Sequence, residues 1–236
     1  MQISERIHLV GSEQIAISHP LDCNCYLLNG GSALAIVDSG LGLGVDDILA
    51  NVEGAAALRE RTGAEVWAPA DQTHMADPTT EPGVRLNVQY GRYPDGFELR
   101  ACAPDRVFGD GEQIRVGDLE LRTIVVQGHS KDSTCLAFED GPKRCLFTGD
   151  VVFYAGKLGI LNLAGFSLDD YRRDIHKLVG LNIDALLPGH GVFVLRRGQK
   201  HIERAIRKLS DFVMPETFFE DNEFVWDREY LKDMTE

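Results

Sequence analysis

Short apolar runs separated by turn signals recur along most of the chain, and this spacing is typical of a protein built from many short β-strands. In the first part of the chain the runs are divided by Gly, Pro and Asn, and Asn29-Gly30-Gly31 predicts a tight hairpin. The strands expected in this part are residues 7–10, 13–17, 25–28, 34–37 and 64–68. These runs make up a first group of strands.

A second group of apolar runs follows, in which Gly117-Asp118 and Asp140-Gly141-Pro142 mark turns. The strands expected here are residues 113–116, 119–126, 135–138, 144–147 and 183–187. Helical spacing predicts helices at residues 45–61, 168–179 and 196–213. Ser167 is the expected N-cap of the second of these helices, because Asp169 and Asp170 follow in its first turn.

Each group of strands is followed by helical segments, and this order favours two packed sheets with helices outside over a single doubly wound sheet. Between the groups, residues 71–111 contain Pro78, Pro82, Pro94 and Pro104 and show no clear periodicity. A stretch of that length without a pattern is typical of a functional or flexible segment. We therefore expect an α/β (α+β) fold of two mixed sheets with helices outside.

Composition narrows the class of protein without naming a partner. The chain has 236 residues, 44% of them hydrophobic and 26% charged, as in an ordinary globular protein. Its net charge of −13 argues against nucleic acid and anionic membranes as partners. No apolar run approaches the roughly 20 residues of a membrane span. The first residues lack a signal-peptide layout, so we expect a cytoplasmic protein.

The five cysteines do not suggest a disulfide scaffold, because their number is odd and the chain is large. Cys23 and Cys25 are two positions apart and would face the same side of a strand. They could hold a metal, but no second pair completes a four-ligand site. We therefore favour the interpretation that they are core residues.

Three short segments each follow an apolar run and each carry a side chain that binds metals. They are Gly128-His129-Ser130, Thr148-Gly149-Asp150 and Pro188-Gly189-His190-Gly191. Each alone is an ordinary turn sequence. Together they place two imidazoles and a carboxylate in glycine-rich loops at strand ends, which is a common way to build a metal site for hydrolysis.

In these segments, and in Val37-Asp38-Ser39-Gly40, the chain resembles the metallo-β-lactamase superfamily, which includes glyoxalase II and lactonases. The resemblance covers residues 7–210. It implies a four-layer αββα sandwich, in a domain of residues 1–214, with the metal site at one edge of the two sheets. It also implies that His129 is the third histidine of the first metal site, that Asp150 bridges two metals and that His190 binds the second.

The His-x-His-x-Asp-His motif of that superfamily is absent where the resemblance places it, at the junction of Glu53 and Gly54. The sequences on either side look like the two helices that normally flank the motif, so the junction resembles an excision of about one strand with its loops. Either the chain truly lacks the motif, or residues have been lost from this sequence, and we favour loss or an artificial deletion. His74 and Asp77 are three positions apart, follow the wrong strand and do not replace the motif.

The resemblance implies a hydrolase in which a metal-bound water attacks an ester, lactone or thioester carbonyl. Zinc is the expected metal, with one or two ions if the motif is present, and iron or manganese is an alternative. Asp38 would orient a ligand histidine, unless it only forms a turn. Ser130 would hydrogen-bond within the His129 loop. The apolar segment 153–166 would line a pocket for a small molecule, such as a small apolar ester or lactone.

A competing interpretation is a non-catalytic or impaired member of the family that acts as a binding or structural module. Without the motif, two histidines and one carboxylate remain, which could hold one metal weakly. Beyond the main domain, residues 215–236 form an acidic tail rich in aromatic residues. We expect this tail to pack against the body of the protein or against another subunit in a homo-oligomer.

Overall fold

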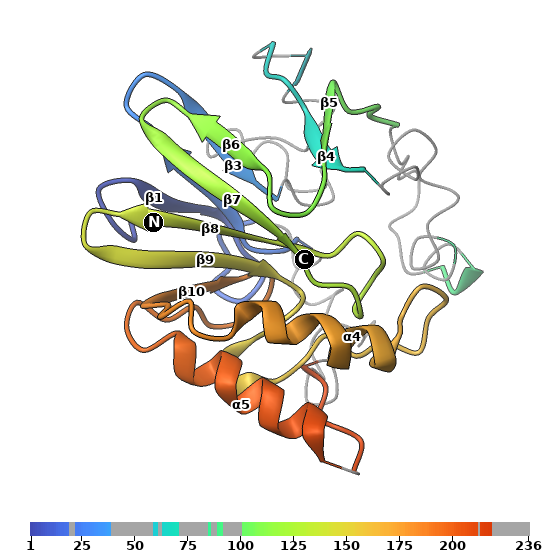
Figure 1. The fold of residues 1–236 in the computed structure, drawn as a ribbon. Coiled ribbons are helices and arrows are strands. Elements are labelled where there is room, and N and C mark those ends of the chain that lie inside the picture. Colours follow the sequence, from blue (N-terminus) through green and yellow to red (C-terminus); the bar gives the residue numbers. More distant parts are fainter. Residues whose placement is uncertain are drawn as a thin grey trace.

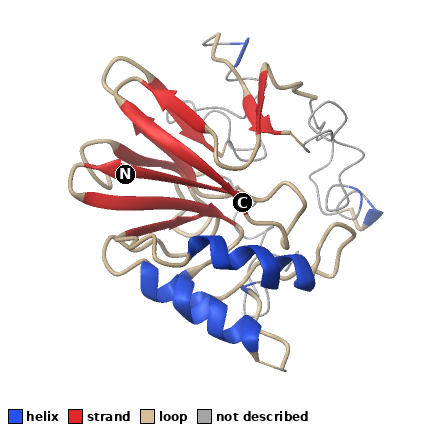
Figure 2. Cartoon of the chain, in the orientation of Figure 1, coloured by secondary structure: helices blue, strands red, loops and turns tan. Residues whose placement is uncertain are grey.

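The computed structural model describes residues 1–18, 22–38, 59–60, 63–70, 85, 89–91, 101–211 and 213–218. In this part of the chain the strands lie together and the two longest helices pack along one side of them (Figures 1 and 2). The predicted helix at 45–61 lies almost entirely outside the described residues, as do the junction of Glu53 and Gly54, His74, Asp77 and tail residues 219–236.

The N-terminal sheet contains three antiparallel strands in the order β1-β2-β3. They are β1 (Ile7–Gly11), β2 (Cys25–Asn29) and β3 (Leu34–Val37). The predicted hairpin after β2 is confirmed, and Gly31 takes the positive φ of 76° that such a turn requires. Because the strands alternate in direction, the end of β1, the start of β2 and the end of β3 lie at the same edge.

The second sheet contains five strands in the order β10-β9-β8-β7-β6. They are β6 (Gln113–Val116), β7 (Leu119–Val125), β8 (Thr134–Asp140), β9 (Lys143–Gly149) and β10 (Ala185–Pro188). β10 is parallel to β9, and β8 is antiparallel to both β7 and β9. Strands β7, β9 and β10 therefore run in one direction and end at one edge of the sheet.

Two further strands, β4 (Trp67–Pro69) and β5 (Arg106–Phe108), form a separate parallel pair. Among the described strands, β3 pairs only with β2, and β4 pairs only with β5. Most of the residues between β3 and β4 lie outside the described part of the chain. The sequence places the missing motif and its strand in this interval.

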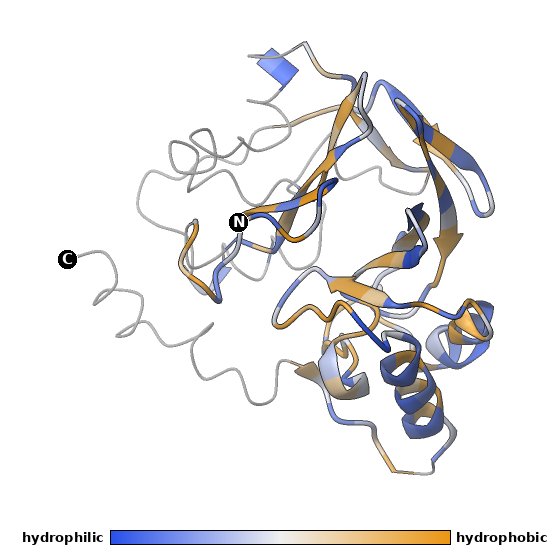
Figure 3. Ribbon diagram, turned by 90° about the vertical axis from the view of Figure 1, so that its left-hand side faces the viewer, coloured by the Kyte–Doolittle hydropathy of each residue, from blue (hydrophilic) through white to orange (hydrophobic). Residues whose placement is uncertain are grey.

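Two apolar clusters hold the layers together. One lies between the sheets and joins Leu9 and Leu28 of the first sheet to Phe138 and Phe147 of the second. The other packs the opposite face of the second sheet against the helices α4 (Leu168–Asp174), η4 (Ile175–Leu178) and α5 (Gln199–Ser210). Figure 3 shows apolar residues along the strands and mostly hydrophilic residues along α5. The expected sandwich of sheets with helices outside is confirmed.

Three details differ from the sequence prediction. Residues 13–17 form turns instead of a strand, since the Ala16 and Ile17 amides donate back to Glu13 O and Ser12 O. Strand β5 was not predicted, because it is short and lies in the proline-rich stretch. The helix predicted at 168–179 changes to a 3₁₀-helix after Asp174, although its cap is confirmed by the hydrogen bond from the Asp170 amide to Ser167 Oγ.

Within the described residues, no helix combines the length and the apolar character that crossing a bilayer requires.

Candidate metal centre

The three side chains singled out by the sequence meet at the edge where β7, β9 and β10 end. Asp150 follows β9, and its Oδ2 lies 3.5 Å from His129 Nε2 and 3.7 Å from His190 Nε2. The side chains are only about one-fifth exposed, at 17% for His129, 23% for Asp150 and 20% for His190. The carboxylate thus stands between the two imidazoles in a partly buried position.

His129 is held from its other ring nitrogen. Its Nδ1 lies 2.7 Å from the carbonyl oxygen of Gly159. A carbonyl oxygen only accepts hydrogen bonds, so Nδ1 carries a proton, and Nε2 is the ring nitrogen that faces Asp150. Residue 159 must be glycine for this approach, because a Cβ there would lie 2.1 Å from Asp150 O and 2.6 Å from His129 Nδ1.

His190 is held by a residue that the sequence analysis did not single out. Its Nδ1 lies 3.0 Å from Glu13 Oε1, and the Glu13 side chain is only 8% exposed. Burial alone would lower the pKa of His190, but the carboxylates of Asp150 and Glu13 outweigh burial and raise it to about 10. The turn at residues 13–16 replaces the predicted strand and directs Glu13 at this ring. The sequence did not predict this turn, because apolar and polar residues alternate there as they do in a strand.

The loop that carries His190 is fixed to the N-terminal sheet. Asn24, which precedes β2 and is 1% exposed, donates from Nδ2 to Pro188 O at 3.0 Å and to Gly191 O at 3.1 Å. Its own side-chain oxygen accepts from Ser12 Oγ at 2.7 Å. The Tyr26 hydroxyl adds a hydrogen bond of 2.9 Å to Pro188 O. The two sheets therefore build the centre together.

Tyr171 of α4 fixes the backbone around Asp150. Its hydroxyl, fully buried, donates to Val151 O at 2.5 Å and lies 3.2 Å from Asp150 O. The Tyr171 hydroxyl oxygen also accepts a hydrogen bond of 3.3 Å from the backbone amide of Gly159. Burial raises the pKa of Tyr171 well above its usual value, so this hydroxyl stays protonated and keeps donating.

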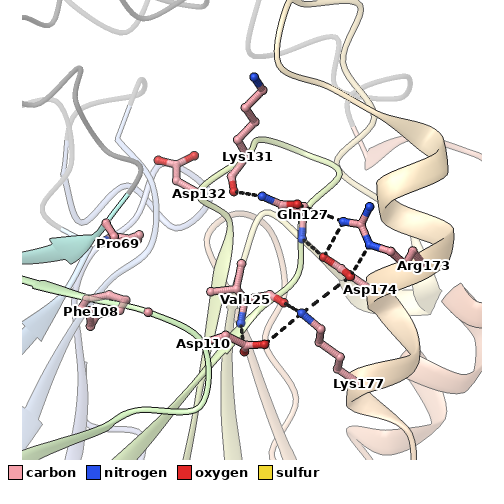
Figure 4. A pocket seen from close by; sticks show the side chains of 12 residues that line it. Pro69, Phe108, Asp110, Val125, Gln127, Lys131, Asp132, Arg173, Asp174 and Lys177 are labelled. Atoms are coloured by element: carbon pink, nitrogen blue, oxygen red, sulfur yellow. Dashed lines mark hydrogen bonds and ion pairs between the residues drawn. The ribbon is translucent and has the colours of Figure 1, made fainter.

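The His129 loop is also fixed from α4, as Figure 4 shows. Asp174, whose side chain is 7% exposed, accepts from the Gln127 amide at 3.1 Å and from Arg173 Nε at 2.9 Å. Gln127 donates from Nε2 to Lys131 O at 2.9 Å and so closes the loop around His129. Arg173 also donates to Gln127 Oε1 at 2.9 Å. These residues line a pocket of about 390 Å³ beside the loop.

Ser130 and Asp38 take different places around the centre. The Ser130 amide donates to Ser133 Oγ at 3.0 Å, and the two hydroxyls are 2.7 Å apart, so Ser130 stabilises the His129 loop. Asp38 follows β3 and has a φ of 61°. The residue is exposed. Desolvation and the Asp150 charge raise its pKa to about 6, against an opposing effect of His190.

Two of the five cysteines, Cys23 and Cys25, lie at the start of β2. Cys25 is buried in β2 and Cys23 is half-buried before it, and both are free thiols. A hydrogen bond with Cys25 and burial raise the pKa of Cys23 well above its ordinary value, so its thiol stays protonated. Cys25 forms a small apolar cluster with Val10, and Cys23 packs against it, which supports the interpretation of this pair as packing residues.

The arrangement fits a metal ion through the chemistry of its donors. His129 and His190 both direct Nε2 at one carboxylate. A cation between them would take the place of the extra proton that the carboxylates favour on His190, and would satisfy all three groups. Nitrogen and carboxylate oxygen are ligands for zinc, iron and manganese. In the described part of the chain, no three His, Cys, Asp or Glu side chains form one closed metal-binding group. The site is instead two pairs that share Asp150.

Comparison with known proteins gives a consistent family assignment. The sequence model of the metallo-beta-lactamase superfamily matches residues 52–190. The human acyl-coenzyme A thioesterase MBLAC2 is 31% identical over 129 residues, covering 50% of this chain and 45% of that protein. An atrochrysone carboxyl ACP thioesterase from Aspergillus fumigatus is 25% identical over 189 residues, covering 78% and 56%. The chain spans about half the length of the curated relatives it matches.

Solved structures give the same fold. A subclass B3 metallo-beta-lactamase of Bradyrhizobium japonicum superposes with a TM-score of 0.63 at 20% identity, covering 89% of this chain and 90% of that one. A metallo-beta-lactamase family protein from Thermus thermophilus gives a TM-score of 0.63 at 19% identity, covering 98% and 90%. At these identities the likeness shows the fold.

Proposed function

Because the chain belongs to the metallo-beta-lactamase superfamily, we propose that its centre is that of a metal-dependent hydrolase acting on thioesters or related carboxylic esters. The observation that carries this proposal is the position of Asp150 between two imidazoles, with Oδ2 at 3.5 Å from one Nε2 and 3.7 Å from the other. Both histidines are also oriented through Nδ1, by Gly159 O and by Glu13.

In this proposal His129 and Asp150 hold one metal position, and His190 and Asp150 hold the other. A bound divalent metal supplies a Lewis acid for the carbonyl and lowers the pKa of water. The chain's own residues prepare the donors. Gly159 O and Glu13 each keep a proton on Nδ1, which leaves Nε2 as the ligand atom. Tyr171 fixes the backbone on which Asp150 sits.

A thioester is the substrate class best supported by the relatives, two of which are named as thioesterases of acyl-coenzyme A and of an acyl carrier protein. The apolar segment 153–166 contributes less than the sequence suggested. Phe153 and Leu158 are buried and pack inside the protein, while Ile160 and Phe166 are partly buried beside them.

A metal-binding module with little or no catalysis is the second candidate function. It is favoured by one observation, the absence of His-x-His-x-Asp-His from the 236-residue sequence. Each metal position then has only one histidine and a shared carboxylate among the residues named above. Such a centre binds metal more weakly than a complete one and holds its water less firmly.

The test combines metal analysis with hydrolysis of acyl thioesters, esters, lactones and β-lactams, with added zinc or manganese. We expect slow turnover that a chelator abolishes and that Asp150→Asn removes. A variant with a His-x-His-x-Asp-His segment inserted between Glu53 and Gly54 should turn over much faster, because it restores the missing ligands. The His176→Ala variant, changed at an exposed position on η4, is the matched control.

Failure of both forms to bind metal and to show chelator-sensitive turnover would contradict the hydrolase proposal. Metal binding without turnover in either form would favour the binding module. Fast turnover by the unmodified chain would show that other residues have taken the missing ligand positions.

A further inference from the structure

We propose that the segment Pro215–Phe218, which we call the C-terminal strap, is a positioning element of the metal centre that acts on both histidines. This inference rests on the metal site of the proposed function. The strap lies beyond the residues 52–190 matched by the family model. It follows α5, and its contacts return the chain to the edge of the sheets where the three strand ends meet.

The strap docks through its backbone on the segment that orients His129. The Phe218 amide donates to Leu158 O at 2.8 Å, and Leu158 and Thr217 form an isolated parallel bridge. The Thr217 hydroxyl lies 2.8 Å from Ile160 O and 3.3 Å from Leu158 O. These acceptors flank Gly159, whose carbonyl oxygen holds His129 Nδ1 at 2.7 Å. Fixing both neighbours of Gly159 fixes the direction of that carbonyl.

The last residue of the strap contacts the other histidine. The Phe218 ring stacks on Phe153 with centroids 4.2 Å apart, and its centroid lies 6.3 Å from that of His190 with 29° between the planes. Gly191 makes room for this ring, since a Cβ there would lie 2.7 Å from Phe218 Cε2. The imidazole of His190 is thus limited on one side by Phe218, while Glu13 holds its Nδ1.

The strap is held by its own contacts. Pro215 is buried, and Glu216 accepts a hydrogen bond of 2.8 Å from Lys208 of α5. Just before it, Val213 is 75% exposed and Met214 is 66% exposed. Val213 and Met214 therefore lie at the surface, whereas the strap after them contacts Leu158 and Phe153. Contacts of this kind hold a residue in place at the centre.

The consequence is a metal affinity that depends on residues that do not touch the metal. Partners that orient a ligand histidine typically contribute about 10–100-fold to metal affinity. The strap acts one step further out, on the supports of His129 and on one face of His190. We therefore expect Phe218→Ala and Thr217→Val each to weaken zinc binding by about three- to tenfold, at the low end of that effect or below it.

The experiment measures the zinc dissociation constant of the full chain by competition with a chelating dye, together with thermal unfolding. Phe218→Ala removes the ring, Phe218→Leu keeps apolar bulk, and Thr217→Val keeps shape without the hydroxyl. Val213→Ala, an exposed change in the same part of the chain, is the matched control. Two-dimensional NMR of the histidine rings adds a readout without metal, because the His190 ring resonances should shift in Phe218→Ala while those of His8 should not.

The inference predicts weaker zinc binding in Phe218→Ala and Thr217→Val, partial recovery in Phe218→Leu and no change in Val213→Ala. Zinc affinity that stays within about twofold of the wild type in both folded variants would overturn it. If Phe218→Ala does not fold, Phe218→Leu and Thr217→Val decide the matter. Weakened zinc binding without thioester hydrolysis would leave the inference standing and contradict the hydrolase, whereas unchanged affinity with intact hydrolysis would do the reverse. A wild-type chain that binds no zinc would overturn the inference, and the hydrolase proposal would then depend on the motif-restored form.

Discussion

At the scale of single residues, the centre depends on which nitrogen of each histidine carries a proton. A carbonyl fixes this for His129 and a carboxylate fixes it for His190. The second arrangement is the stronger one, because a carboxylate is a stronger acceptor than a carbonyl and the Glu13 side chain is only 8% exposed. A buried carboxylate without its imidazole partner would be costly, so Glu13 and His190 stabilise each other's positions.

Replacing Glu13 tests this arrangement. We expect Glu13→Ala to weaken zinc binding by about tenfold or more, because His190 loses the acceptor that directs Nε2 at Asp150. Glu13→Gln should weaken it less, since an amide oxygen can still accept from Nδ1 but carries no charge. The measurement is chelator competition, and Glu139→Gln, with a side chain 74% exposed, is the control. Equal affinities for wild type and Glu13→Ala would show that Glu13 has no positioning role.

The sequence could predict that His129, Asp150 and His190 lie together, but not which residues orient them. His129, Asp150 and His190 each follow a recognisable strand and stand beside glycine, so motif and context agree. Glu13 lies in an alternating segment that favours a strand, and only the tertiary contact to His190 explains the turn found there. Phe218 lies far along the chain in an acidic tail. The aromatic content of that tail predicted packing, but it did not predict which residues Phe218 contacts.

At the scale of elements, strand direction explains why the site forms. β7, β9 and β10 were predicted within a few residues of their observed bounds, and their parallel run brings three loops to one edge. The loops alone would not hold their side chains at these distances. Tyr171 and Asp174, both on α4, fasten the Asp150 backbone and the His129 loop to the helix. Helix packing could be predicted from periodicity, but these polar attachments could not.

Asp174 gives the protein a defined response to acid. Burial alone would raise the pKa of Asp174, but hydrogen bonds from Arg173 and the Gln127 amide, with the charge of Lys177, lower it below the ordinary value of about 3.9. A carboxyl group with a lowered pKa in the folded state adds stability above the pKa of the unfolded state. That stability is lost as the pH falls through the folded-state pKa.

We therefore expect Asp174→Asn to lower the free energy of unfolding by about 1–3 kcal/mol at pH 7. The difference from wild type should begin to shrink below about pH 4, where Asp174 of the unfolded chain binds a proton, and should vanish at the lower pH at which the folded-state carboxyl is protonated. Urea unfolding at a series of pH values measures this, with Asp169→Asn, 96% exposed, as the control. A difference that stays constant down to the lowest pH at which the protein folds would contradict the assigned role of the carboxylate.

At the scale of the whole molecule, the described strands form two larger sheets and one separate pair. β3 lies at the edge of one sheet, and β4 pairs with β5 in another. The sandwich, the order of the motifs and the two-sheet core were predictable, because apolar periodicity is continuous on both sides of the interval between β3 and β4. Residues 39–58 lie outside the described part of the chain, so the expectation for the junction of Glu53 and Gly54 stays a prediction.

The central claim is that His129, Asp150 and His190 form one metal centre with Asp150 shared. The most direct test is the zinc affinity of the wild-type chain and of His129→Ala, Asp150→Asn and His190→Ala, measured by chelator competition with His176→Ala as the control. We predict that every change at the centre weakens zinc binding by more than about tenfold, and that Asp150→Asn has the largest effect because it serves both imidazoles. Unchanged zinc affinity in Asp150→Asn would contradict the account.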